Sequence, residues 1–365
     1  TEVVHTAYDA PVDLPAKDQI ELAERYLFEL AETGKTNSGF QKFTTALKNA
    51  IDMAAAAFQR DGHLSGLATG LKDLDSKMGG LQKSDLIILA GRPGMGKTAL
   101  ATNIAYNVAK AWEGGVRADG HYETTNGGVV GFFSLEMSNE QLATRILSEQ
   151  TEISSSRIRR GDIQDKDFEK LVNKVTEIQH LPLLIDDTGG LTIAQLATRA
   201  RRIKRQRGLD LLVVDYLQLL QGSTRRSSEN RVQEITEITT KLKALAKELN
   251  VPILALSQLS RQVENRDDKK PQLSDLRESG SIEQDADVVL FVFREEYYLG
   301  TKEPRVGSDE HAKWRIEMGA AHGKAEVIIG KQRHGPTGPV PLQFDAEFTR
   351  FGNFVDEARL PVEMR

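Results

Sequence analysis

Cysteine is absent from this 365-residue sequence, so disulfide bonds and thiolate metal sites are excluded. No apolar run approaches the roughly 20 residues that a membrane-spanning helix needs, and the first residues lack the basic-then-apolar pattern of a secretory signal. A basic excess is also missing, because the formal net charge is −5. Domains that bind nucleic acid are usually basic, so a nucleic-acid site here should be local. We therefore expect a cytoplasmic protein without membrane contact. The length alone suggests about two domains, and one large α/β domain with an appendage fits as well.

The sequence does contain a complete phosphate-binding pattern, G-x-x-x-x-G-K-T, at residues 91–98. A short apolar run at 86–90 precedes it and a helical pattern at 99–111 follows, which disfavours the alternative of a plain connecting turn. The glycines let backbone N–H groups point inward at the positive end of a helix. Lys97 should contact the β and γ phosphates of ATP or another nucleoside triphosphate, and the Thr98 hydroxyl should bind Mg²⁺. The predicted nucleotide-binding residues are Gly91, Arg92, Pro93, Gly94, Met95, Gly96, Lys97, Thr98 and Ala99.

Apolar runs typical of buried strands alternate with helical stretches from residue 86 onward. Strands covered on both faces predict an α/β fold with a mainly parallel central sheet flanked by helices. Ligands bind beyond the carboxyl ends of such strands. Two polar stretches, 113–128 and 299–323, are predicted to be surface insertions. The predicted strands are 86–90, 129–134, 183–185, 211–215, 253–257, 288–293 and 326–330, with a closing strand near 342–344.

Three polar side chains lie at or just after the carboxyl ends of predicted strands. Asp215 should lie across from the phosphate loop and help hold Mg²⁺, although it could instead cap a turn. Glu136 could activate a water molecule for attack on the γ phosphate, or it could be a surface or capping residue. The Gln258 amide could bind the γ phosphate, or it could simply be hydrogen-bonded in place. The pattern alone leaves these alternatives open.

Two helices are predicted before the phosphate loop, at about 18–32 and 39–60. The second has an apolar stripe that must be covered. Packing on its own chain and docking on a neighbouring subunit are both compatible with the pattern. The stripe consists of Phe40, Phe43, Leu47, Ile51, Ala54 and Phe58.

The order of these motifs, together with several others, resembles the bacterial replicative helicases of the DnaB family over residues 64–351. The longest matching motif, D-L-R-E-S-G-S-I-E-Q-D-A-D at 275–287, is far more specific than a phosphate loop. The other matching motifs are S-L-E-M-S at 134–138, V-D-Y-L-Q at 214–218, L-S-Q-L-S-R at 256–261 and K-Q-R-H-G-P-T-G at 331–338.

The resemblance implies a RecA-like phosphate-loop motor domain at 63–351, preceded by a helical linker arm at 1–62 and followed by a tail at 352–365. It also implies a homohexameric ring that moves 5′ to 3′ on single-stranded DNA. A primase and a helicase loader are implied as further partners. Part of the surface that meets them lies in the family's N-terminal helical domain, which we do not expect within these residues.

Roles for individual residues also follow from the resemblance. Glu136 becomes the catalytic carboxylate and Gln258 the γ-phosphate sensor. Lys331 and Arg333 are implied to reach the phosphates bound by an adjacent subunit, where an arginine stabilises the transition state. Arg277, Glu278 and Gly280 resemble the family's channel loop, where an arginine and backbone amides bind DNA phosphates, although a surface ion pair is the simpler interpretation of Arg277 beside Glu278.

Two other functions share parts of this pattern. A RecA-type recombinase-like, DNA-dependent ATPase would have the same core but would form filaments. A nucleotide-gated scaffold or helicase loader would bind nucleotide without acting as a motor. The 275–287 motif and the Lys331–Arg333 pair argue against the recombinase. Nucleotide hydrolysis measured with and without single-stranded DNA separates a motor from a scaffold, which should show no stimulation.

Overall fold

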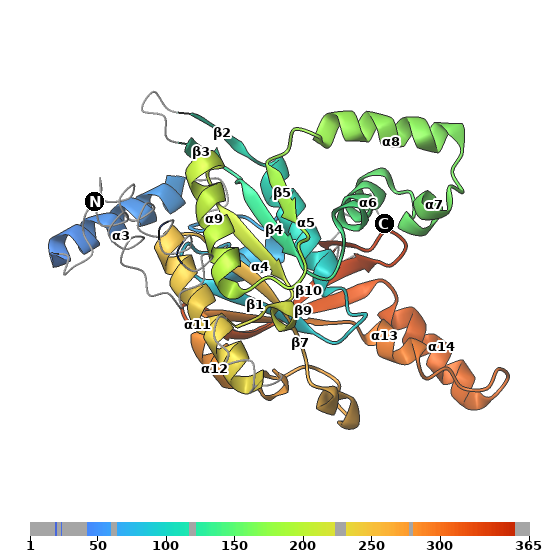
Figure 1. Ribbon diagram of the computed structural model, residues 1–365. Helices are drawn as coiled ribbons and strands as arrows, with labels where there is room; N and C mark the ends of the chain where they lie inside the picture. Colours follow the sequence, from blue (N-terminus) through green and yellow to red (C-terminus); the bar gives the residue numbers. More distant parts are fainter. Residues whose placement is uncertain are drawn as a thin grey trace.

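A nine-stranded sheet forms the centre of the computed structural model, which describes residues 19, 23, 42–59, 64–116, 122–222, 231–276 and 280–354 (Figure 1). The strand order is β11-β10-β9-β8-β1-β7-β6-β4-β5. Neighbouring strands are parallel from β5 to β8 and antiparallel from β8 to β11. The strands are β1 Leu86–Gly91, β4 Val130–Ser134, β5 Leu183–Asp186, β6 Leu211–Asp215, β7 Ile253–Gln258, β8 Val288–Phe293, β9 Lys324–Gln332, β10 Gly338–Asp345 and β11 Arg350–Asn353.

The central strands are apolar because helices cover both faces of the sheet. In β1, Ile87 and Leu89 face one core, whereas Ile88 and Ala90 face the other. All six residues of β1 are buried. Full burial of one such aliphatic side chain contributes about 1.5–3 kcal/mol, so continuous apolar runs specify strands of this kind. The predicted fold class, a mainly parallel sheet between helices, is confirmed.

Helices α4 and α5 pack on the first core, and α9 and α11 pack on the second (Figure 1). Helices α6, α7 and α8 form a separate group that contacts the sheet region through α5. The helices are α3 Phe43–Gln59, α4 Lys72–Met78, α5 Lys97–Lys110, α6 Asn139–Thr151, α7 Ser155–Arg160, α8 Asp165–Ile178, α9 Ile193–Arg207, α11 Arg231–Leu249, α12 Gly280–Asp285, α13 Glu295–Gly300 and α14 Asp309–Ala321.

Both predicted insertions contain regular structure that the sequence analysis did not predict. The first forms an antiparallel hairpin of β2 (Glu113–Val116) and β3 (Tyr122–Asn126), and the second contains α14. Strand β11 was also not predicted, and it extends to Asn353, past the predicted domain boundary at 351. It pairs with β10, and the rings of Phe344 and Phe351 lie 4.7 Å apart.

Helix α3 presents its apolar stripe to solvent. Phe43, Ile51 and Phe58 are 75%, 67% and 76% exposed, and Leu47 is 46% exposed. Packing on the described part of its own chain therefore does not cover this stripe. The predicted helix at 18–32 and Phe40 of the stripe lie outside the residues whose structure is described, apart from residues 19 and 23.

Candidate functional site

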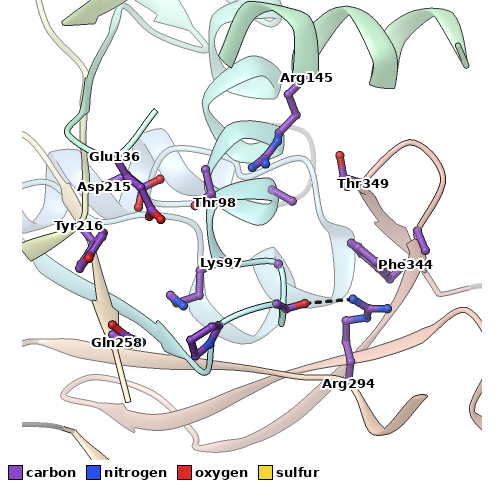
Figure 2. A pocket seen from close by; sticks show the side chains of 15 residues that line it. Lys97, Thr98, Glu136, Arg145, Asp215, Tyr216, Gln258, Arg294, Phe344 and Thr349 are labelled. Carbon is purple, nitrogen blue, oxygen red and sulfur yellow. Dashed lines mark hydrogen bonds between the residues drawn. The ribbon is translucent and has the colours of Figure 1, made fainter. Parts of the chain in front are cut away.

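A pocket of about 400 Å³ lies at the carboxyl ends of the central parallel strands (Figure 2). Its lining comes from the phosphate loop and the start of α5, from α6, from the ends of β4, β6, β7 and β8, and from the region of β10 and β11. The lining residues are Pro93, Gly94, Gly96, Lys97, Thr98, Ala99, Glu136, Arg145, Asp215, Tyr216, Gln258, Arg294, Phe344, Ala346 and Thr349. This is the location at which open α/β sheets bind ligands.

The phosphate loop has the backbone that its glycines predict. Gly94 and Gly96 have φ of 79° and 96°, a left-handed region in which side chains are strained. A Cβ on Gly94 would also lie 2.6 Å from the Tyr297 ring. Gly96 caps the amino end of α5, so the positive end of that helix faces the pocket. The loop thus has the form of an anion-binding site.

The Lys97 side chain is hydrogen-bonded to the backbone of its own phosphate loop. Its Nζ donates to the carbonyl oxygens of Gly91 at 2.9 Å and Arg92 at 3.3 Å. Burial lowers the pKa of Lys97 to about 8, although the carboxylates of Asp215 and Glu136 favour its charged form. A phosphate could replace both carbonyl acceptors and would favour the charged form further.

Not every residue of the predicted nucleotide-binding set lines the pocket. Arg92 is buried and directed to the loop after β7, where it pairs with Glu264 at 2.7 Å and donates to the Leu259 carbonyl at 2.9 Å. Met95 is buried in the first core. Gly91 approaches the Lys97 side chain and the backbone of β8 but does not line the pocket. These three residues therefore support the loop on the side away from the pocket.

The two candidate carboxylates come together above the loop (Figure 2). Strands β4 and β6 are adjacent and parallel, which places Glu136 beside Asp215. Burial raises the pKa of Asp215 to about 6, and Glu136 adds to this shift. The Thr98 hydroxyl, Lys97 and Arg145 act in the opposite direction. A divalent cation at this position would also favour the ionised carboxylate.

Gln258 ends β7 and lines the pocket, as the strand-end prediction indicated. Its backbone N–H donates to the side chain of Gln218 at 3.4 Å, and the Gln218 amide donates to the Ser257 hydroxyl at 3.0 Å. The structure therefore links the polar ends of β6 and β7. The Gln258 side chain remains directed to the pocket (Figure 2).

Lys331 and Arg333 do not join this pocket. They lie at the far end of β9, which pairs antiparallel with β8 so that Gln332 is opposite Val288. This is the edge where the parallel strands begin, whereas the phosphate loop follows the end of β1. Each parallel strand here spans roughly 17 Å, so the two cations are remote from their own chain's phosphate loop.

The predicted DNA-binding residues are only partly within the described structure. Arg277 and Glu278 lie outside the described residues. Gly280 is the first residue of α12 and is exposed. Helix α12 packs on α11, away from the phosphate loop.

Several pocket residues were missed by the sequence analysis. Arg145 enters from α6 and is directed toward Asp215 and Glu136, and burial lowers the pKa of its guanidinium. Arg294 follows β8, donates to the Gly94 carbonyl at 3.4 Å, and lies with its guanidinium carbon 3.8 Å from the centroid of the Phe344 ring. The signal for Arg294 was available, because it ends an apolar strand as Glu136 does. Arg145 gave no such signal.

Comparisons with known proteins agree with this architecture. A sequence model of the DnaB-like helicase C-terminal domain matches residues 66–353. The replicative DNA helicase DnaB of Rickettsia conorii is 48% identical over 352 residues, which are 96% of this chain and 70% of that protein. The replicative DNA helicase DnaB of Geobacillus stearothermophilus is 41% identical over 352 residues, covering 94% of this chain and 70% of that protein.

Two solved structures are also similar. One, described as an ATPase domain, has a TM-score of 0.72 and 33% identity, and the match covers 87% of this chain and all of that domain. A DnaB-like replicative helicase, described with its interactions with primase, has a TM-score of 0.69 and 30% identity over 97% of this chain and 75% of its own. Among the described residues, no helix is both long and apolar enough to cross a membrane. With its phosphate loop and paired carboxylates at the ends of parallel strands, the chain belongs to the DnaB-like replicative DNA helicases, a class of ATP-dependent enzymes.

Proposed function

We propose that the chain is the motor of a homohexameric ring. In this proposal each nucleotide is bound by one subunit and hydrolysed with help from the next. The resulting movement draws single-stranded DNA through the ring in the 5′ to 3′ direction and separates the duplex. The observation that carries the proposal is the division of the site, because the pocket contains Lys97, Glu136 and Asp215, whereas Lys331 and Arg333 lie at the opposite edge of the sheet.

Within one pocket the roles follow from position. Lys97 and the loop N–H groups would hold the β and γ phosphates. Glu136 would orient and deprotonate the attacking water, and Gln258 would bond the γ phosphate and respond to its loss. Arg145 is a further cation that this geometry offers to the phosphates.

A divalent cation fits beside Thr98 and Asp215. Among the described residues, Oδ2 of Asp215 is buried without a hydrogen-bond partner, and such an orphaned acceptor suits a hard cation. The described ranges contain no cluster of three or more His, Cys, Asp or Glu side chains that could hold a metal. We propose Mg²⁺, with phosphate and water oxygens as its other ligands. When bound, it would neutralise charge on the phosphates during transfer.

A ring would complete the site from outside. A head-to-tail contact is the interface type that closes into a ring, and it could bring one subunit's Arg333 to the next subunit's pocket. Two exposed apolar stripes support such a contact: the one on α3, and one on α8 formed by Phe168, Val172 and Val175, which are 60%, 48% and 42% exposed. Covering such surfaces is a general driving force for association.

The DNA contact is proposed for the segment between β7 and α12. The Arg277 side chain and the backbone N–H groups of Glu278 and Gly280 would bind DNA phosphates, which makes binding tolerant of base sequence and sensitive to salt. We also propose a primase as a partner, because one similar helicase is described with its interactions with primase. A helicase loader is proposed from the family resemblance alone. The proposed location is the cytoplasm.

Subunit mixing tests the shared site. Arg333→Ala and Glu136→Ala should each abolish DNA-stimulated ATP hydrolysis when present alone. In an equal mixture of the two, an interface that pairs an intact pocket with an intact Arg333 should regain activity, to roughly a quarter of the wild-type rate if subunits mix randomly in a head-to-tail ring. Arg315→Ala, at an exposed position on α14, is the control and should retain the wild-type rate. A mixture without rescue would contradict a site shared between subunits.

A further inference from the structure

Helix α12 holds both cations that the proposed function assigns to the neighbouring pocket. Lys331 Nζ donates to the carbonyl oxygens of Glu283 at 2.5 Å and Ala286 at 2.8 Å, at the carboxyl end of α12. Arg333 donates to the Gln284 carbonyl at 3.1 Å. Free carbonyls at a helix end are the negative end of its dipole, so this end of α12 is a natural binding site for two positive side chains.

Asp287 is the second part of this arrangement. Its side chain is 7% exposed, and its Oδ1 pairs with the Arg333 Nε at 3.2 Å. Its Oδ2 accepts the Leu86 N–H at 2.8 Å and also pairs with Lys243. The backbone adds two bonds, from Arg333 N–H to the Asp287 carbonyl and from Asp287 N–H to the Leu86 carbonyl. A buried carboxylate with this many donors is fixed in place, so it fixes the direction from which Arg333 emerges.

The same helix connects directly to the proposed DNA contact. Gly280 begins α12 immediately after residues 277–279, and only about 9 Å separates the two ends of a helix of this length. The helix is anchored on α11, because Asp285 accepts the hydroxyls of Thr239 at 2.7 Å and Thr240 at 3.0 Å. These bonds hold the carboxyl end of α12, the end whose carbonyls bind Lys331, against α11.

Arg333 is held but not enclosed. Its side chain is 48% exposed, whereas that of Asp287 is 7% exposed. The guanidinium can therefore turn outward to another molecule while its backbone stays tied to Asp287.

We propose that Asp287 and α12 form a positioning unit for Arg333 and Lys331. Together they would set the reach of the two cations toward the next subunit's nucleotide. Asp287 is a positioning residue in this scheme, because it acts through Arg333 and touches no nucleotide. The inference rests on the proposed function, since it assumes that Arg333 acts across the subunit interface.

The test introduces Asp287→Asn into only one of two kinds of subunit at a time. Rings are mixed from Arg333→Ala subunits, whose pockets are intact, and Glu136→Ala subunits, which can supply only Arg333. Adding Asp287→Asn to the Glu136→Ala subunits should lower the restored, DNA-stimulated rate roughly tenfold, the effect of losing a hydrogen bond between charged groups. The KM for ATP should not change, because the working pocket belongs to the other subunit.

The matched control is the same substitution in the Arg333→Ala subunits. There it should leave the restored rate within about twofold, since no Arg333 remains for it to position. Asparagine keeps an oxygen acceptor for the Leu86 N–H, and the phosphate loop lies at the other end of β1. An equal loss in both subunit types would show a structural role and overturn the inference, as would no loss in either.

A second variant keeps the inference testable if Asp287→Asn subunits fail to assemble. Asp285→Ala releases α12 from Thr239 and Thr240 without touching Arg333. It should also lower the restored rate only when carried by the subunits that supply Arg333, and loss on both sides or neither would again overturn the inference. If mixed rings without these changes show no rescue, the shared site itself fails, which is a distinct result.

Discussion

The fold raises the pKa of the buried Glu149 carboxyl, so this group keeps its proton at a higher pH than an exposed glutamate does. It lies on α6 with 5% of its surface exposed. Its oxygens accept the Asn103 amide at 2.5 Å and the Gln150 amide at 3.2 Å. Burial raises the pKa of Glu149 from 4.5 to about 7, against the Asn103 bond, Arg350 and the Gln150 bond. The folded protein therefore binds a proton here that the unfolded chain has already released.

The sign of the effect on stability follows from this difference. The contribution of Glu149 is fully present below pH 4.5 and is lost as the pH rises through about 7. A pKa difference of this size corresponds to about 3 kcal/mol of unfolding free energy across that window. Glu149→Gln removes the titration but leaves one amide donor without an acceptor, at a cost of about 1 kcal/mol.

The variant and the wild type should therefore exchange their order of stability with pH. At pH 8 Glu149→Gln should be more stable by about 2 kcal/mol, and at pH 4, below the unfolded pKa, it should be less stable by about 1 kcal/mol. Urea unfolding followed by intrinsic fluorescence at each pH measures this. Glu169→Gln, at an exposed position on α8, is the control and should show no exchange. A stability difference that stays constant between pH 4 and pH 8 would refute the reasoning.

Two further perturbations test the phosphate loop. ATP affinity should weaken as the pH rises through about 8, because Lys97 is charged only below its pKa in the free pocket; calorimetric titration from pH 7 to 9 measures this. Lys97→Arg, which stays charged, should flatten the profile, and an equally flat wild-type profile would contradict the assignment. Arg92→Ala should lower the unfolding free energy by about 2 kcal/mol, because it leaves the Leu259 carbonyl without this donor. Glu264→Gln should cost under about 1 kcal/mol, because that carboxylate is half-exposed. If urea unfolding showed a larger loss of stability for Glu264→Gln than for Arg92→Ala, the buried bond to Leu259 would not be the main contribution of Arg92.

The sheet could be predicted from the sequence because its strands are buried on both faces. Runs such as 211–214 and 288–293 are entirely apolar, and the structure places strands there. The hairpin β2–β3 and strand β11 escaped prediction for the opposite reason. Their residues are polar or glycine-rich and partly exposed, and their conformation depends on pairing between strands, of β2 with β3 and of β11 with β10, which no local apolar run reveals.

The pocket could be predicted where chemistry coincides with the end of a strand. Glu136, Asp215 and Gln258 were found in this way, because parallel strands end at one edge. Arg145 could not be found, since only the packing of α6 directs one of several helical arginines to the carboxylates. The sequence also did not reveal that Arg92 points away from the pocket, because its partner Glu264 lies far along the chain.

The last strand of the sheet imposes an order on biosynthesis. The N–H of Phe351 donates to the side chain of Asn103, 248 positions earlier, and the Phe351 ring lies against Gly96 of the phosphate loop. At about 5–20 residues per second, a ribosome needs on the order of 10–50 seconds to make the segment between them. A nascent chain therefore contains its phosphate loop well before β11 has been synthesised. Its nucleotide pocket is complete only when nearly all of the motor domain has been translated.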